Sequence, residues 1–375
     1  MMSDITTLDN RTDTLFKRIS ELIDQSRRFA VNAVNVAEVR TRFEVGRYIF
    51  EDEQRGERAT YGQQVLKKLS ARLMERYGND WTYDTLKRCR FFYQAYSNPI
   101  IGATPLHQLQ DKLKPTDNES TTNCGNTVAP IQTPRFTLSW SHYLVLMRIE
   151  NPDERSFYEI EATEQQWSVK QLKRQVGSSL YERLALSRDK DEVMRLAREG
   201  QTVEKPSDII INPITLEFLG LKPDAAYTES KLENAIIGRM QQFLLELGKG
   251  FLFEARQKRF TFEERNFYVD LVFYNRLLQC YVLIDLKTGD LTHQDLGQMQ
   301  MYVNYYNRYV KQDFEKPTIG ILMCKTANNS LVELTLPEDA NIYAQQYTLY
   351  MPDKTLLQNK LREWVAEFNE KEDRK

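Results

Sequence analysis

The sequence predicts an α+β protein, with an all-α N-terminal domain and a C-terminal α/β domain built on a mixed central sheet. From residue 12 to about residue 97, apolar side chains recur at intervals of three and four, as on one face of a helix. After residue 207, helical patterns alternate with short runs rich in β-branched and aromatic residues. A helical half and a half that mixes both patterns together indicate this fold class.

The predicted domain boundaries follow these changes of pattern. Residues 12–185 form the helical domain, and within it the stretch 98–134 combines five prolines with a polar run, which is typical of a loop or insertion. Residues 186–207 are charged and are expected to form a linker, and residues 208–370 form the second domain. A chain of 375 residues is long enough for both domains.

Composition excludes several classes of protein. No run of 18 apolar residues is present, so we expect no membrane span, and the charged start of the chain does not have the pattern of a secretory signal. The four cysteines lie far apart, which argues against a zinc site and indicates a reducing, cytoplasmic setting. Because the net charge is −2, any attraction to nucleic acid must come from local patches.

The elements of the second domain are predicted from periodicity. Residues 230–248 read as one amphipathic helix that ends at Gly248, and residues 292–310 read as another. A final helix is expected over 354–369. Strands are expected over 250–264, 266–275, 279–289, 318–325 and 343–350.

The two strands of the hairpin at 267–287 can be paired from the sequence. A four-residue loop, Arg276–Gln279, places Asn275 opposite Cys280. Asp270 then lies opposite Asp285, and directly opposed residues share one face of the sheet.

Lys287 follows Asp285 by two positions and shares that face. On the other face, every paired residue is apolar. A slip of one residue would move the apolar residues to the wrong face and separate the carboxylates, so the pairing is a specific hypothesis. The apolar residues are Val269, Leu271 and Phe273, opposite Leu286, Ile284 and Val282.

The group formed by Asp270, Asp285 and Lys287 has the chemistry of a phosphodiesterase site. Two close carboxylates repel each other unless a cation joins them, and oxygen ligands favour Mg²⁺ or Mn²⁺. Such a metal can activate water, while the lysine orients that water or neutralises charge at phosphorus. The alternative is that both acids are solvated residues of an edge strand.

The pattern of Asp270, fourteen residues, and then Asp285-Leu-Lys287 resembles the PD-(D/E)xK nuclease signature. Stretches along most of the chain, among them "VGRYIFEDEQRGERATYGQQVLKKLS" and "DLGQMQMYVNYY", resemble the YhcG-like nuclease family. The resemblance implies a helical domain followed by a restriction-endonuclease-like nuclease domain. This chain departs from the family by having Asp285 where Glu is usual, which shortens the reach of the carboxylate, and by its long insertion.

The resemblance also implicates three further residues. Glu233 matches an acidic metal ligand of the first core helix, and Gln298 and Tyr302 match a Gln-x-x-x-Tyr element. Glu233 has an alternative interpretation, because Ser230 to Glu233 also reads as a capping box. Tyr302 is the candidate for contact with nucleic acid, with a core aromatic residue as the alternative.

The helical domain carries a local excess of positive charge, with 17 lysines and arginines against 12 acidic residues from 11 to 90. Arg72 and Arg76 are four apart on one helix face and are the candidates for binding backbone phosphate. An ordinary charged surface explains the same residues.

The sequence therefore predicts a metal-dependent nuclease whose catalytic residues are Asp270, Asp285, Lys287, Glu233 and Gln298. The first two acids and Glu233 would hold Mg²⁺ or Mn²⁺. DNA is the expected partner, since the family is associated with restriction, repair or defence against mobile elements, and a second copy or another protein could bind the helical domain. The alternatives are an inactive nuclease fold that binds nucleic acid and a protein-interaction adaptor.

Overall fold

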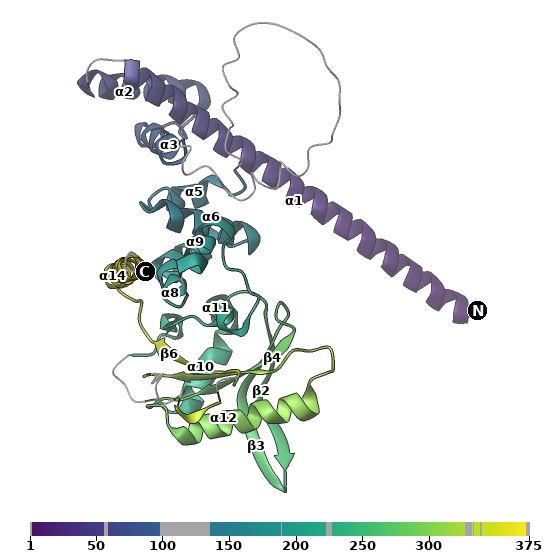
Figure 1. The fold of residues 1–375 in the computed structure, drawn as a ribbon. Helices are drawn as coiled ribbons and strands as arrows, with labels where there is room; N and C mark the ends of the chain where they lie inside the picture. Colours follow the sequence, from purple (N-terminus) through teal and green to yellow (C-terminus); the bar gives the residue numbers. More distant parts are fainter. Residues whose placement is uncertain are drawn as a thin grey trace, which may run out of the picture. The chain divides into compact units, whose positions relative to one another are not determined.

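The computed structural model describes residues 2–55, 59–97, 136–188, 190–222, 227–326, 332, 334–337 and 340–372 (Figure 1). The chain divides into two compact units, Met1–Leu172 and Lys173–Lys375. The predicted insertion at 98–134 lies outside the described residues. The predicted domain boundaries stay a prediction.

The first unit is helical throughout its described elements, as predicted. Its helices are α1 (Met2–Arg55), α2 (Ala59–Tyr77), α3 (Tyr83–Tyr96), α5 (Trp140–Leu146) and α6 (Pro152–Glu164), and α7 (Val169–Gly177) crosses the division between the units. An aromatic cluster joins α1, α3 and α5, in which the ring of Phe92 lies 5.7 Å from Phe43 and 5.3 Å from Trp140. A Cβ atom at Gly46 would lie 2.0 Å from the carbonyl oxygen of Cys89, so α1 and α3 can approach this closely because glycine stands there.

A six-stranded mixed sheet forms the centre of the second unit, in the order β1-β6-β5-β4-β3-β2. Strands β2, β3 and β4 are antiparallel neighbours, whereas β4, β5, β6 and β1 run parallel. This is the mixed sheet that the sequence predicts. The strands are β1 (Ile214–Thr215), β2 (Phe251–Phe262), β3 (Arg265–Asn275), β4 (Cys280–Leu286), β5 (Ile319–Cys324) and β6 (Ile342–Thr348).

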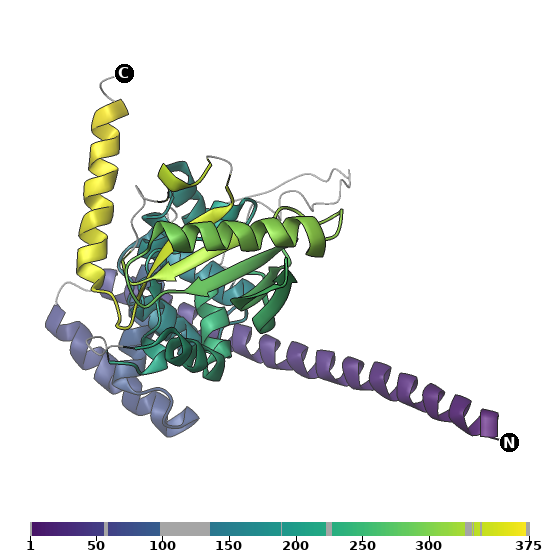
Figure 2. The same ribbon diagram turned by 90° about the horizontal axis from the view of Figure 1, so that it is seen from below.

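Helices cover both faces of this sheet. Helix α12 (His293–Tyr305) lies along one face (Figures 1 and 2), where Met299 and Val303 pack in one core cluster with Val272 and Leu283. On the other face, Phe243 of helix α11 contacts Phe273 with ring centroids 5.9 Å apart. Both sides of β4 and of the second half of β3 are therefore buried, which explains why β4 is apolar except at Asp285.

The predicted single helix over 230–248 is wrong. The structure has two helices, α10 (Glu229–Gly238) and α11 (Met240–Leu247), with Arg239 between them at φ −130° and ψ 30°. The break follows Gly238, a residue with low helix propensity. The predicted C-terminal end at Gly248 is confirmed, since this residue is the C-cap of α11.

The second unit contains further helical elements. These are α8 (Leu180–Ala185), α9 (Lys190–Glu199), the 3₁₀ helices at Pro206–Ile209 and Glu217–Leu219, the π-helix at Tyr306–Val310, and α14 (Lys354–Glu372). Within the described residues, no helix is both long enough and apolar enough to span a membrane.

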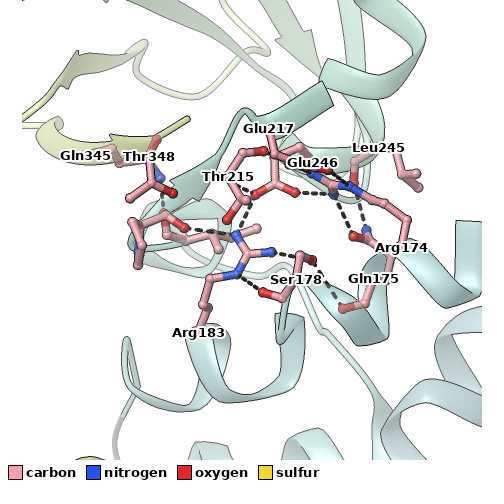
Figure 3. Close-up of polar contacts among 12 residues, drawn as sticks. Arg174, Gln175, Ser178, Arg183, Thr215, Glu217, Leu245, Glu246, Gln345 and Thr348 are labelled. Carbon is pink, nitrogen blue, oxygen red and sulfur yellow. Dashed lines mark hydrogen bonds and ion pairs between the residues drawn. The ribbon is translucent and has the colours of Figure 1, made fainter. Parts of the chain in front are cut away.

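A buried ionic network ties α7 and α8 to β1 and α11 (Figure 3). Glu246 is fully buried and pairs with Arg183, also fully buried, and with Arg174. The backbone N–H of Thr215 donates to Oε1 of Glu246 at 2.8 Å, and Arg174 also pairs with Glu217 at 3.0 Å. Burial alone would raise the pKa of Glu246, but the two guanidinium groups hold it below its ordinary value. Glu246 is therefore an ionised carboxylate whose charge is compensated inside the unit.

Candidate active site

The predicted hairpin register is confirmed for the five residue pairs from Leu271–Ile284 to Asn275–Cys280. Asn275 pairs with Cys280, Phe273 with Val282, and Leu271 with Ile284. The turn is set by Asn275, because its Oδ1 accepts the backbone N–H groups of Leu277 at 3.0 Å and Leu278 at 3.1 Å. This side-chain turn fixes the loop length without an Asn-Gly pair.

The register brings Asp270 to the strand that carries Asp285 and Lys287. Oδ2 of Asp270 accepts the backbone N–H of Leu286 at 2.9 Å. Nζ of Lys287 lies 2.8 Å from Oδ2 of Asp285. The three residues that the sequence predicts as the centre of the site are thus brought together at the end of β4.

Two acids that the sequence analysis missed surround the same lysine. Nζ of Lys287 lies 3.5 Å from Oδ1 of Asp295 and 4.0 Å from Oε2 of Glu229. Asp295 closes a capping box with Thr292 at the start of α12, and this Thr-x-x-Asp spacing is visible in the sequence. Glu229 is the first residue of α10, and nothing local in the sequence connects it to Lys287.

Burial and neighbouring charges shift the pKa values of Asp285 and Lys287. Asp285 is 4 % exposed. Burial first, and then the negative charge of Asp270, raise the pKa of Asp285 to about 7, although Lys287 acts in the opposite direction. Burial alone would lower the pKa of Lys287, but the carboxylates of Asp285, Glu229 and Asp295 raise it above its ordinary value. The lysine is therefore an ammonium ion, and one cation serves several acids.

Two roles are predicted for Glu233, that of a metal ligand and that of a capping residue. The capping-box interpretation is wrong, because the N-cap of α10 is Thr228, whose side chain accepts the N–H of Lys231 at 3.2 Å. Glu233 lies one turn further along and is buried. It pairs with Arg256 and accepts a hydrogen bond of 2.8 Å from Nε2 of Gln257.

Gln298 and Tyr302 lie on α12 and are hydrogen-bonded to each other. Tyr302 is 1 % exposed, and its ring packs against Phe260 at 5.5 Å. The prediction that Tyr302 contacts nucleic acid is therefore corrected to the core alternative, because a buried ring cannot stack on a base. Burial raises the pKa of Tyr302, and the charges of Asp285 and Asp270 raise it further. Its bond to Gln298 places that amide on the same side of α12.

In the first unit, Arg72 and Arg76 lie on α2 and both are exposed, as binding to phosphate would require. Arg76 also lies over the ring of Tyr77 at 5.3 Å. Other arginines of this unit are engaged in structure. Arg42 pairs with Glu38 at 2.8 Å and lies over Trp140 at 5.0 Å.

The residues of the site fit a hard divalent cation in part. Asp270 and Asp285 supply oxygen atoms, and Oδ2 of Asp285 is buried without a well-directed hydrogen bond from the described residues, although Lys287 is close. Within the described part of the chain, no three His, Cys, Asp or Glu side chains are arranged to hold one metal ion together. Among the described residues, Gln257 connects Glu233 to Asp270, because its amide contacts both.

Comparison with known proteins places this geometry in a family. Residues 207–362 match the family described as "YhcG PDDEXK nuclease domain", and residues 18–183 match "DUF1016 N-terminal domain". The chain is 35 % identical over 345 residues, 92 % of each chain, to "Putative nuclease YhcG" of Escherichia coli strain K12.

A solved structure, "crystal structure of a repair endonuclease from Pyrococcus abyssi", is similar over 35 % of this chain and 50 % of that chain, at 21 % identity and a TM-score of 0.24. That low score adds nothing to the assignment. The identity across nearly the whole relative and the two consecutive domain matches decide it: the chain belongs to the YhcG family, which joins a DUF1016 N-terminal domain to a PDDEXK nuclease domain.

Proposed function

We propose that this protein is a metal-dependent nuclease that hydrolyses phosphodiester bonds of DNA. The observation that carries the proposal is the group formed by Asp270, Asp285 and Lys287, in which a buried acid with a raised pKa lies 2.8 Å from an ammonium group. Strongly perturbed acids beside a charged partner are typical of catalytic sites.

Asp270 and Asp285 are the metal ligands in this proposal, with Glu233 as a third. Mg²⁺ or Mn²⁺ would lower the pKa of a bound water and stabilise negative charge on a phosphate oxygen. The carboxylates of the chain would hold the cation. Because Asp270 lies within β3 and Asp285 near the end of the adjacent β4, they fix where a phosphate can approach.

Lys287 has the role of a charged group rather than of a base. Its raised pKa keeps the proton on Nζ while the neighbouring acids are ionised, so it can neutralise charge at phosphorus but cannot take a proton from water. Gln298 orients the substrate or the water through its amide, and Tyr302 holds that amide in place.

The helical unit contributes binding in this proposal. The exposed side chains of Arg72 and Arg76 bind backbone phosphate, which positions the substrate without reading its sequence. A second copy of the chain or another protein could bind elsewhere on this unit. We expect the enzyme to work in the cytoplasm, in restriction, repair or defence against mobile elements.

A cleavage assay tests the proposal directly. The purified chain should cut at least one of a set of single-stranded, double-stranded and branched DNA and RNA substrates with Mg²⁺ or Mn²⁺, and EDTA should stop the reaction. The matched control is Asp270→Asn, which should bind the same substrate without cutting it. Binding without cleavage under all these conditions would instead support an inactive nuclease fold, and neither binding nor cleavage would support an adaptor.

A further inference from the structure

Gln257 has an unusual backbone for its position. It lies inside β2, across from Asp270, between the pairs Arg256 with Leu271 and Lys258 with Val269. Its φ is +48°, in the left-handed region that non-glycine residues adopt at a cost in free energy. Such strain persists where the surrounding structure requires it, so the contacts of this side chain are of interest.

The amide of Gln257 joins two acids from different elements. Its Nε2 donates to Oε2 of Glu233 on α10 at 2.8 Å and to Oδ1 of Asp270 on β3 at 2.9 Å. A primary amide has two N–H groups, and here each reaches a different carboxylate. Because one nitrogen bonds both acids, their oxygens lie within about two hydrogen-bond lengths of each other.

The left-handed backbone explains how this becomes possible. Neighbouring side chains in a regular strand point to opposite faces. Here Arg256 and Gln257 are neighbours, yet both contact Glu233. The kink at Gln257 therefore turns two consecutive side chains toward the same buried acid.

We propose that Gln257 is a positioning residue that assembles Glu233 and Asp270 into one pair of metal ligands. This inference rests on the proposed function and extends it to a residue outside the acids and the lysine. Two adjacent carboxylates repel each other, and a lysine or arginine that bridged them would compete with a metal cation. A neutral amide holds both acids without adding charge. The second oxygen of Glu233 pairs with Arg256 and that of Asp270 accepts the N–H of Leu286, so a cation would bind through the remaining lone pairs of these oxygens. Ligating carboxylates generally need such hydrogen-bond partners to keep their orientation.

The deciding variant is Gln257→Gly. Glycine adopts a φ of +48° without strain, so this change preserves the backbone kink and removes only the amide. The matched control is Gln279→Gly. Gln279 is an exposed residue of the turn between β3 and β4, and its φ of +54° is also positive. Mn²⁺ binding is measured by titration calorimetry, and the metal-free variant is compared with the parent by crystallography.

If the amide assembles the ligands, Gln257→Gly should weaken Mn²⁺ binding by about tenfold or more, the range usual for partners of metal ligands. In the metal-free crystal, the carboxylates of Glu233 and Asp270 should move apart, while the thermal midpoint stays close to that of the parent. Gln279→Gly should leave Mn²⁺ affinity unchanged. Gln257→Asn, which keeps the amide and tolerates the left-handed region, should recover part of the lost affinity.

Unchanged Mn²⁺ affinity in Gln257→Gly, with both carboxylates in their original places, would overturn the proposal and leave Gln257 as a residue of the backbone kink. A parent chain that binds no Mn²⁺ would instead overturn the proposed function. In that case, the crystallographic comparison alone decides whether the amide holds the two acids together.

Discussion

The backbone N–H of Leu286 donates a hydrogen bond of 2.9 Å to Oδ2 of Asp270. Leu286 stands between Asp285 and Lys287, so this bond attaches the first acid to the segment that carries the other two groups. The main chain of β4 thus sets the spacing of the site. For this reason, side chains at positions 285 and 287 can be replaced without dismantling the hairpin that presents them.

Lys287→Ala should abolish cleavage and leave nucleic-acid binding nearly intact, because Nζ supplies charge to the reaction, while the backbone pairing of β3 with β4 holds the hairpin. Lys287 is 14 % exposed at its side chain, so circular dichroism should verify that the variant folds. Cleavage rates are measured on the preferred substrate, with the exposed Lys222→Ala as a control for the loss of one positive charge. Parent-like turnover in Lys287→Ala would remove this lysine from the mechanism.

The raised pKa of Asp285 predicts how the metal-free protein responds to pH. The folded state holds this proton up to a pH of about 7, whereas an unfolded aspartate releases it near pH 4. The folded state therefore binds more protons than the unfolded state between these values, and the free energy of unfolding falls as pH rises from about 4 to about 7.

Asp285→Asn should remove this dependence. At pH 8, without metal, the variant should be more stable than the parent by about 1–3 kcal/mol, whereas at pH 4 the two should be nearly equal. Thermal unfolding at both pH values measures the difference. If the variant is less stable than the parent at pH 8, the raised pKa of Asp285 is contradicted. Added Mg²⁺ should raise the stability of the parent but not that of Asp285→Asn.

Glu233→Gln should lower Mg²⁺ affinity and turnover, because it replaces an anionic oxygen ligand with a neutral amide. Its effect on metal-free stability should be small. Since Thr228 is the N-cap, Thr228→Ala should cost about 1 kcal/mol of stability without changing metal affinity, and Ser230→Ala should be nearly silent. Full activity of Glu233→Gln at limiting Mg²⁺ would leave a site of two carboxylates and one lysine.

Charge reversal at both Arg72 and Arg76 should weaken DNA binding and reduce its salt dependence, by about one unit of slope for each lost phosphate contact. Affinity is measured across a salt titration. The control reverses the charge of two exposed basic residues of the second unit, Arg198 and Lys222, which gives the same change of net charge. Equal effects of the two double variants would indicate a response to net charge alone and return Arg72 and Arg76 to ordinary surface.

The sequence was sufficient for the parts of the site that depend on neighbours along one hairpin. The loop length and the apolar residues of the hairpin predict its register, and this register brings Asp270 to the segment that carries Asp285 and Lys287. Contacts that join separate elements were missed. Glu229 reaches Lys287 because α10 packs beside β4, and no pattern within either segment encodes that approach.

Gln257 was missed for a different reason. Its left-handed backbone accompanies contacts with Glu233 and Asp270 on other elements, whereas the sequence around it reads as a regular strand. Gly238 is a weak sequence signal for the helix break at Arg239, because a continuous helix can also contain a glycine. The helix propensity of the residues around Gly238 does not distinguish one continuous helix from two helices.

The buried carboxylate of Glu246 determines where the chain can be truncated without loss of stability. A fragment that starts at residue 207, where the nuclease-domain match begins, keeps Glu246 but loses Arg174 and Arg183. It would retain an uncompensated buried charge, at a cost of about 3–5 kcal/mol. A fragment that starts at Lys173 keeps both partners and should unfold at a clearly higher temperature. The folded nuclease half therefore begins before residue 207, where the sequence match begins. A chimera of two relatives would keep this network only if α7 and α8 came from the same parent as the nuclease domain.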